Sequence, residues 1–139
     1  MHHQEEFVVS TTGQGLYAVT RQVQAIAARA GVDIGLATVF VRHTSASLII
    51  NENADPDVPR DLQAFFERLV PEGDPLYLHT AEGPDDMPAH VKSALTATTL
   101  GIPITAGRAA LGTWQGVYLW EHRRARHERR VIVHVSGSR

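Results

Sequence analysis

The chain contains no cysteine. This absence excludes disulfide bonds and thiolate chemistry, so a bound metal ion would need histidine, carboxylate or backbone oxygen ligands. No apolar run approaches the roughly 20 residues of a membrane-spanning helix, and residues 1–6 lack the apolar region of a signal peptide. We therefore expect a cytoplasmic protein with no membrane partner, and we expect His2 and His3 to lie in a mobile N-terminal end.

A strong charge of one sign is also absent, because the net charge is −2 at pH 7. No overall basic field would attract nucleic acid. The 139 residues are 43% hydrophobic and 20% charged, which is typical of one globular domain with a single core, so we expect residues 1–139 to form one domain. The chain has twelve arginines but only one lysine, Lys92. The nucleotide composition of the coding DNA is the simplest explanation for this preference for arginine.

Apolar periodicities predict strands that alternate only partly with helices. This order favours an α+β fold over a doubly wound one. Strands 36–43 and 46–53 are apolar on both faces, which predicts a sheet covered on both sides, at least in the assembled protein. The last helix should turn Val91, Ala94 and Leu95 to the core. The expected strands are 7–9, 16–19, 36–43, 46–53, 100–104, 117–123 and 130–136, and the expected helices are 20–30, 55–69 and 88–97.

Three histidines are candidates for one site. His43 ends a strand, His79 lies in a polar loop, and His90 sits in the first turn of a helix. The positive end of that helix disfavours imidazolium, so His90 should be neutral, which is the ligand form for Zn²⁺. Their spacings match no short motif, so three unrelated polar histidines remain the alternative.

Hydroxyls and carboxylates follow His43. Thr44, Ser45 and Ser47 could hold phosphate oxygens, although a turn between strands also favours small polar residues. Glu52 and Glu121 lie on strand faces shared with apolar residues, where an unpaired carboxylate would be costly. They are therefore acid–base or ligand candidates, or partners in structural ion pairs.

The only basic run is 123–130. RNA contact or anion capture would be its functional interpretation. The run lies in an expected hairpin turn, where charges commonly face solvent, and it lacks aromatic residues for base stacking. We therefore do not expect nucleic-acid binding.

Four segments together resemble the YjbQ-like family, also called the secondary thiamine-phosphate synthase enzyme family. They are H-T-S-A-S-L (43–48), N-E-N-A-D-P-D-V (51–58), H-T-A-E-G-P-D-D-M-P-A-H (79–90) and G-T-W-Q-G-V-Y-L-W-E-H (112–122). The resemblance implies a mixed, largely antiparallel sheet, three helices and a homotrimer. It also implies weak thiamine-phosphate synthase activity, which joins a pyrimidine diphosphate to a thiazole phosphate and releases pyrophosphate. The family's marked residues fall on His43, Thr44, Ser45, Ser47, Asn51, Glu52, Asn53, Asp61, His79, His90, Trp114, Gln115 and Glu121.

We therefore expect a small enzyme that acts on a phosphorylated small molecule in a pocket near a subunit interface. His43, His79 and His90 would surround a divalent ion, Zn²⁺ or Mg²⁺, or a phosphate group, and no organic cofactor is expected. A metal-dependent hydrolase and a non-catalytic ligand-binding trimer are the alternatives. The expected catalytic residues are His43, Glu52 and Glu121, and the expected substrate-binding residues are Thr44, Ser45, Ser47, Asn51, Asn53, Lys92, Arg108, Trp114 and Gln115.

Overall fold

The computed structural model describes residues 1–139 as an α+β domain with three helices. The elements are β1 (His2–Thr11), β2 (Gly15–Ala18), α1 (Thr20–Ala30), β3 (Ile34–Val41), β4 (Ala46–Glu52), α2 (Asp57–Leu69), α3 (Asp86–Leu95), β5 (Thr99–Thr105), β6 (Arg108–Ala109), β7 (Gln115–Glu121) and β8 (His127–Ser138). None of the three helices is long and apolar enough to cross a membrane.

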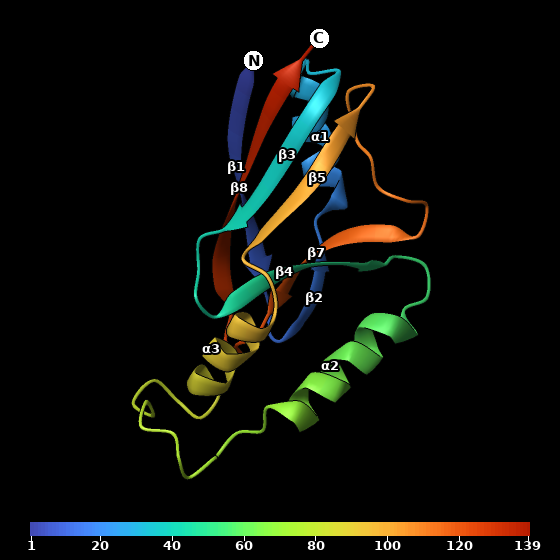
Figure 1. Cartoon of the computed structure of the whole chain (residues 1–139). Coiled ribbons are helices and arrows are strands. Elements are labelled where there is room, and N and C mark those ends of the chain that lie inside the picture. The colour runs from blue at the N-terminus through green and yellow to red at the C-terminus, as the bar shows by residue number, and fades with distance from the viewer.

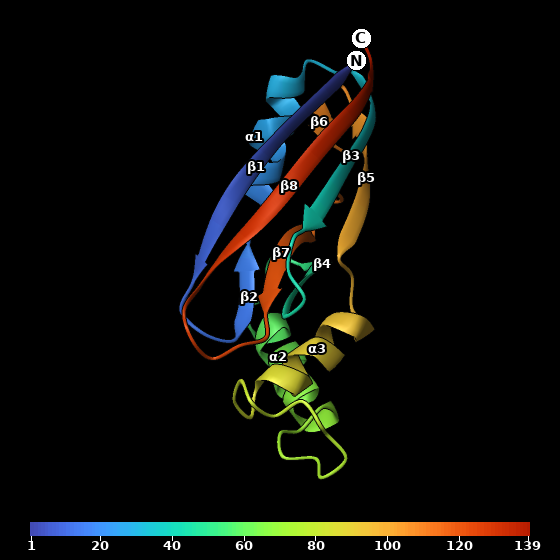
Figure 2. The same cartoon turned by 90° about the vertical axis from the view of Figure 1, so that its left-hand side faces the viewer.

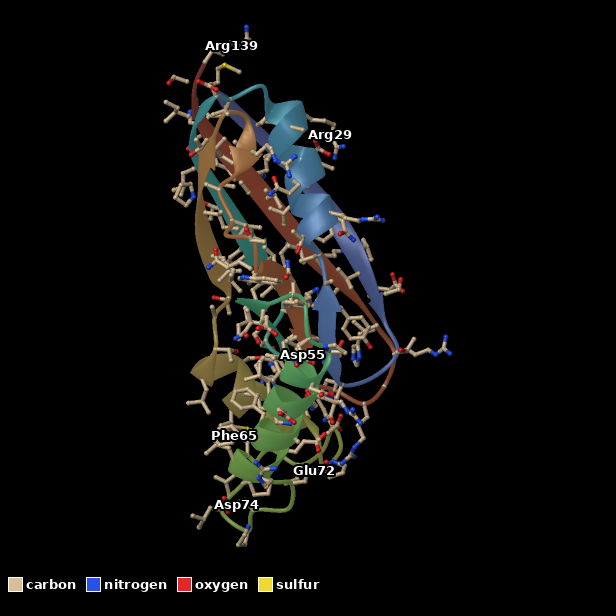
Figure 3. All side chains as sticks on the ribbon, turned by 90° about the vertical axis from the view of Figure 1, so that its right-hand side faces the viewer. Arg29, Asp55, Phe65, Glu72, Asp74 and Arg139 are labelled. Carbon is tan, nitrogen blue, oxygen red and sulfur yellow. The ribbon has the colours of Figure 1, made fainter.

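The strands form two antiparallel sheets rather than one mixed sheet. A five-stranded sheet has the order β1-β8-β3-β5-β6, and a three-stranded sheet has the order β2-β7-β4. Every pairing between these strands is antiparallel. The larger sheet forms one end of an elongated molecule, and α2 and α3 lie at the other (Figure 1). Arg139 and Asp74 accordingly mark opposite ends (Figure 3).

Helix α1 covers one face of the five-stranded sheet (Figure 2). Its apolar stripe, which includes Val23 and Ile26, joins Val39, Val133 and Leu119 in a buried core. Gly31 ends the helix in the left-handed conformation, with φ of 66°, as its place after the stripe predicts.

The opposite face of this sheet is uncovered within one chain. Side chains on β3 that alternate away from the core stay open, with Ile34 66%, Leu36 44% and Phe40 43% exposed. Within a single chain the sheet is therefore covered on one face only, whereas the sequence predicted that both faces would be covered, at least in the assembled protein. Helix α2 shows a related feature, because Phe66 of its apolar stripe is buried while Phe65 is 53% exposed.

Two expectations about the elements are wrong. His2 and His3 are not a mobile end, because β1 pairs with β8 over its whole length, from His2 opposite Ser136 to Thr11 opposite His127. Helix α3 begins at Asp86 and buries Asp86, Lys92 and Ser93, whereas Leu95 is exposed. Pro88 and Ala89 are buried on the same side, so the buried face is mixed rather than an apolar stripe, and apolar periodicity gave the wrong orientation.

Candidate functional site

Helix α3 and the loop before it bring two histidines and an aspartate together. His79 Nε2 lies 2.6 Å from Asp86 Oδ2, and His90 Nε2 lies 3.1 Å from the same oxygen. One ligand atom from each of these three residues lies within 4.8 Å of the other two. Asp86 and His90 are four residues apart, which places them on one face of the helix. We call this set the His–Asp cluster.

Neighbouring groups orient the ligand atoms of the cluster. Arg123 Nη1 donates to Asp86 Oδ1 at 2.7 Å, which leaves Oδ2 facing the histidines. His90 Nδ1 lies 3.0 Å from the carbonyl oxygen of Thr44. Because that oxygen can only accept, Nδ1 must carry the hydrogen. Metal-binding histidines commonly donate their second ring nitrogen to a carbonyl or carboxylate in this way.

The contact between His90 Nε2 and Asp86 Oδ2 is favourable only with a proton or a cation between the two atoms. With its hydrogen on Nδ1, a neutral His90 directs the Nε2 lone pair at a carboxylate oxygen, so two acceptors face each other. A second proton or a metal ion between them removes this conflict. The cluster therefore favours a cation at the point where its three ligand atoms converge.

His79 and Asp86 shift each other's pKa values. The hydrogen bond to Asp86 raises the pKa of His79 above its usual value. Burial favours the neutral form of Asp86, but the hydrogen bond with His79 and the charge of Arg123 outweigh it and lower the pKa of Asp86. The carboxylate is thus ionised near neutral pH, as a metal ligand must be.

His43 lies beside the cluster but outside it, so the expected three-histidine ligand set is not formed in the chain. Its Nε2 accepts the backbone N–H of Arg130 at 2.8 Å. Burial, followed by the charge of Arg129, lowers the pKa of His43, so the ring is neutral with its hydrogen on Nδ1. His43, Thr44 and His90 line one cleft of about 240 Å³, where His43 can donate a hydrogen bond.

Three residues expected at an open site belong to buried networks instead. Glu121 is fully buried and receives Thr11 Oγ1 and Arg129 Nε, each at 2.7 Å. Ser45 Oγ accepts Arg129 Nη2 at 3.0 Å, and Ser47 Oγ lies 2.8 Å from His122 Nε2. Burial favours neutral Glu121, but the hydrogen bonds from Arg129 and Thr11 lower its pKa. The structural ion pair is therefore the better interpretation of Glu121.

A second group of expected residues lies at the far end of β4. Glu52 pairs with Gln115 at that end, while Ala46 pairs with Glu121 at the other. Asn53 N donates to Trp114 O at 3.0 Å. The seven residues of β4 separate the two ends by about 20 Å, at roughly 3.3 Å per residue. The expected single pocket is therefore not formed within one chain, and the residues excluded from the cleft are Asn51, Glu52, Asn53, Trp114 and Gln115.

The remaining candidates lie elsewhere. Arg108 is exposed on β6 at the sheet edge, and Asp61 is exposed on α2. Lys92 is buried on α3, and burial lowers its pKa, partly offset by the charges of Glu67 and Asp85.

Most arginines of the basic run 123–130 pair with carboxylates. These pairs are Arg123 with Asp85 and Asp86, Arg124 with Glu72, Arg129 with Glu121, and Arg130 with Glu6.

Sequence reasoning missed Asp86 as a member of the His–Asp cluster and Arg123 as the residue that orients it. Asp86 precedes Pro88, the expected first helical residue, so it was placed in the loop. If the helix had been expected to begin at Asp86 rather than at Pro88, the four-residue spacing of Asp86 and His90 would have placed both on one helix face. No local pattern indicates Arg123, which is 37 positions away from Asp86.

Comparison with known proteins gives one consistent result. A family model described as "UPF0047 protein YjbQ-like" matches residues 5–138. A UPF0047 protein of Synechocystis is 61% identical over 135 residues, which are 97% of this chain and 92% of the relative. UPF0047 protein YjbQ of Escherichia coli O157:H7 is 42% identical over 138 residues, 99% of each chain.

Solved structures show the same fold. A crystal structure of an uncharacterized yjbq/upf0047 protein from Clostridium acetobutylicum has a TM-score of 0.88 at 36% identity, covering 95% of this chain and 99% of that one. A protein of unknown function from Sulfolobus solfataricus has a TM-score of 0.91 and covers 99% of each chain at 24% identity, which supports the fold alone.

Proposed function

The chain belongs to the UPF0047 YjbQ-like family, and from this premise we propose that it is a cytoplasmic, metal-dependent enzyme that acts on a phosphorylated small molecule. The convergence of His79, Asp86 and His90 carries the proposal. Nitrogen and carboxylate ligands suit Zn²⁺, and three protein ligands leave a position for substrate. A bound ion would supply positive charge to phosphate oxygens.

Residues of the adjacent cleft support a substrate next to the ion. Neutral His43 can donate from Nδ1, and exposed Thr44 offers a hydroxyl. Thiamine-phosphate formation is the reaction we propose to test, because pyrophosphate departure needs positive charge at the leaving oxygens. A metal-dependent phosphate hydrolase at the same cluster is the second candidate, because an open metal position can also activate water.

We also propose that the functional unit is a homotrimer. The exposed apolar side chains of β3 lie on the uncovered sheet face and would be buried by neighbouring copies. Assembly could also bring Asn51, Asn53 and Trp114 of one chain to the cleft of another, which would reunite residues that one chain keeps about 20 Å apart.

The test combines metal content with turnover. Chelator-stripped protein is reloaded with Zn²⁺ or Mg²⁺, the bound metal is measured, and thiamine phosphate is assayed from the pyrimidine diphosphate and thiazole phosphate. We expect about one ion per chain and metal-dependent product. His90→Ala should lower metal affinity at least about tenfold and abolish turnover, since it removes a ligand.

The matched control is His3→Ala, which alters a histidine of β1 that contacts Glu5 rather than the cluster. Equal metal content and equal rates in wild type and His90→Ala would refute the metal site. Metal-dependent release of inorganic phosphate without thiamine phosphate would instead favour the hydrolase.

A further inference from the structure

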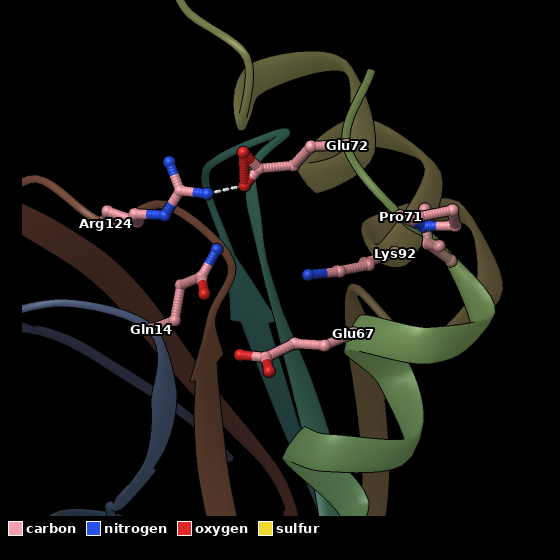
Figure 4. A pocket seen from close by; sticks show the side chains of 7 residues that line it. Gln14, Glu67, Pro71, Glu72, Lys92 and Arg124 are labelled. Atoms are coloured by element: carbon pink, nitrogen blue, oxygen red, sulfur yellow. Dashed lines mark ion pairs between the residues drawn. The ribbon is translucent and has the colours of Figure 1, made fainter. Parts of the chain in front are cut away.

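A second cavity lies on the other side of α3 from the His–Asp cluster. Lys92 follows His90 by two residues, which is about 200° around a helix. The cavity has a volume of about 420 Å³ and lies between α2, α3, the loop before β2 and the loop before β8 (Figure 4). Its lining residues are Gln14, Glu67, Val70, Pro71, Glu72, Lys92 and Arg124.

Lys92 is the unusual feature of this cavity. Its side chain is only 3% exposed and points between Glu67 and the Arg124–Glu72 ion pair (Figure 4). The ammonium group makes no hydrogen bond and no ion pair, since the only Lys92 atom bonded to a side chain is its carbonyl oxygen, which accepts from Thr96. The ammonium nitrogen is not one of the fully enclosed polar atoms, so its open side faces the cavity, where a ligand can reach it.

Free acceptors face the same space. Gln14 donates its Nε2 to the carbonyl oxygen of His122 at 3.0 Å, which leaves its Oε1 without a partner. Glu67 Oε1 accepts from Gln63 at 3.2 Å, which leaves Oε2 free. Arg124 is neutralised by Glu72. The cavity therefore offers one unpaired cation beside two unpaired acceptors.

We propose that this cavity, which we call the Lys92 pocket, binds a small molecule in which an oxyanion lies next to an O–H or N–H donor. Lys92 holds the oxyanion, and Gln14 and Glu67 accept from the donor. The carboxylate of Glu67 disfavours a bare anion, so the donor is required for complementarity. A phosphate ester that carries a neighbouring hydroxyl group and an amino acid share this chemistry.

The test is a titration of the full chain, followed through backbone amide resonances at constant ionic strength. Inorganic phosphate, which carries an O–H donor near pH 7, forms one arm. Glycine forms the second arm, and acetate, which lacks a donor, forms the third. We expect saturable shifts around Gln14, Glu67 and Arg124 with phosphate, glycine or both, and at least tenfold weaker binding of acetate. Phosphate alone identifies a phosphorylated ligand, and glycine alone identifies an amino acid.

Variants separate this pocket from the metal site. Lys92→Met should weaken binding at least tenfold. Arg126→Met removes an exposed cation of the basic run 123–130, which also contains Arg124 of the pocket, and should leave binding unchanged. The double variant His79→Ala/His90→Ala should keep the binding, so a failure of the metal proposal would not affect this result. Shifts limited to the cluster, equal binding by Lys92→Met, or acetate as strong as the other probes would overturn the proposal.

The fold of Lys92→Met provides an internal check. Because the substitution removes a largely buried cation that makes no hydrogen bond or ion pair within the chain, its thermal midpoint in ligand-free buffer should rise by roughly 4 °C. A more stable protein that no longer binds is the expected signature of a ligand-binding lysine. A lowered midpoint would show that Lys92 stabilises the fold and would contradict the assignment.

Discussion

His122 is a buried histidine that stays neutral over most of the accessible pH range. It packs against Trp120 and Phe66, with ring centroids 5.4 and 6.1 Å away. Its Nδ1 has no hydrogen-bond partner, while Nε2 contacts Ser47. Burial lowers the pKa of His122 to about 3, and the charge of Lys92 acts in the same direction.

This depressed pKa predicts a loss of stability in mild acid. The unfolded chain binds a proton at His122 below about pH 6.5, whereas the folded chain does not, so stability falls as pH falls through that value. The contribution is about 2 kcal/mol between pH 7 and pH 5, at 1.36 kcal/mol per pK unit. Urea unfolding at both pH values should show this loss in wild type and a smaller one in His122→Gln.

The comparison between the two proteins isolates His122 from other titrating groups. His79 acts in the opposite direction, because its raised pKa favours the folded state in acid, and both proteins retain it. The same pH dependence in wild type and His122→Gln would show that His122 is accessible to protons in the folded protein.

Strands β3 and β8 approach each other unusually closely where two glycines pair. Gly35 lies opposite Gly137, and a Cβ added at Gly35 would lie 2.0 Å from the carbonyl oxygen of Ser136. Backbone atoms cannot move aside without breaking the ladder, so the strand pair depends on glycine here.

Gly35→Ala should therefore destabilise the protein by at least about 3 kcal/mol, through backbone overlap in the centre of the larger sheet. Gly101→Ala on neighbouring β5 is the matched control, since its Cβ would meet Leu36 Cδ1 at an ordinary 3.7 Å. Urea unfolding of both variants measures the difference. Equal stability of the two would show that β3 and β8 can separate locally without loss of the fold.

One face of the five-stranded sheet is not covered by any other element of the chain, and it exposes apolar side chains to solvent. On this face Phe40 of β3 lies opposite Ile132 of β8, whereas Val8 of β1 lies opposite Arg130 and Ile132 lies opposite Glu6. Ile34, Leu36 and Phe40 are thus exposed apolar side chains on a face that also carries the ion pairs of Glu6 with Arg42 and Arg130. Exposed apolar residues with a polar surround are a common feature of interaction sites, which supports the proposed trimer.

A charge on this face should disrupt the trimer. Leu36→Glu would place a carboxylate in the proposed interface, where desolvation without a partner is costly. Light scattering during size-exclusion chromatography should give three times the chain mass for wild type and a lower mass for the variant. Leu78→Glu, at a 97% exposed leucine of the loop before α3, should remain trimeric. A wild-type monomer would refute the proposal.

Local patterns in the sequence were sufficient for the class of fold and for the neighbourhood of the site. Apolar periodicity predicted three helices, and Gly31 ends α1 as expected. His79 and His90 lie in one short segment, and their rings are 5.5 Å apart in the structure. These features depend on residues close in the sequence, where helical and strand geometry fix which side chains are neighbours.

Contacts between distant residues were decided by the packing of the sheets and helices. Asp86 keeps Oδ2 toward the histidines because the β7–β8 connection brings Arg123 to its Oδ1. Ser47 is enclosed because strand pairing places it beside His122. The length of β4 separates Asn53 from His43. Periodicity shows which residues share a face of one element, but which element covers that face depends on register and on the path of the connections between strands.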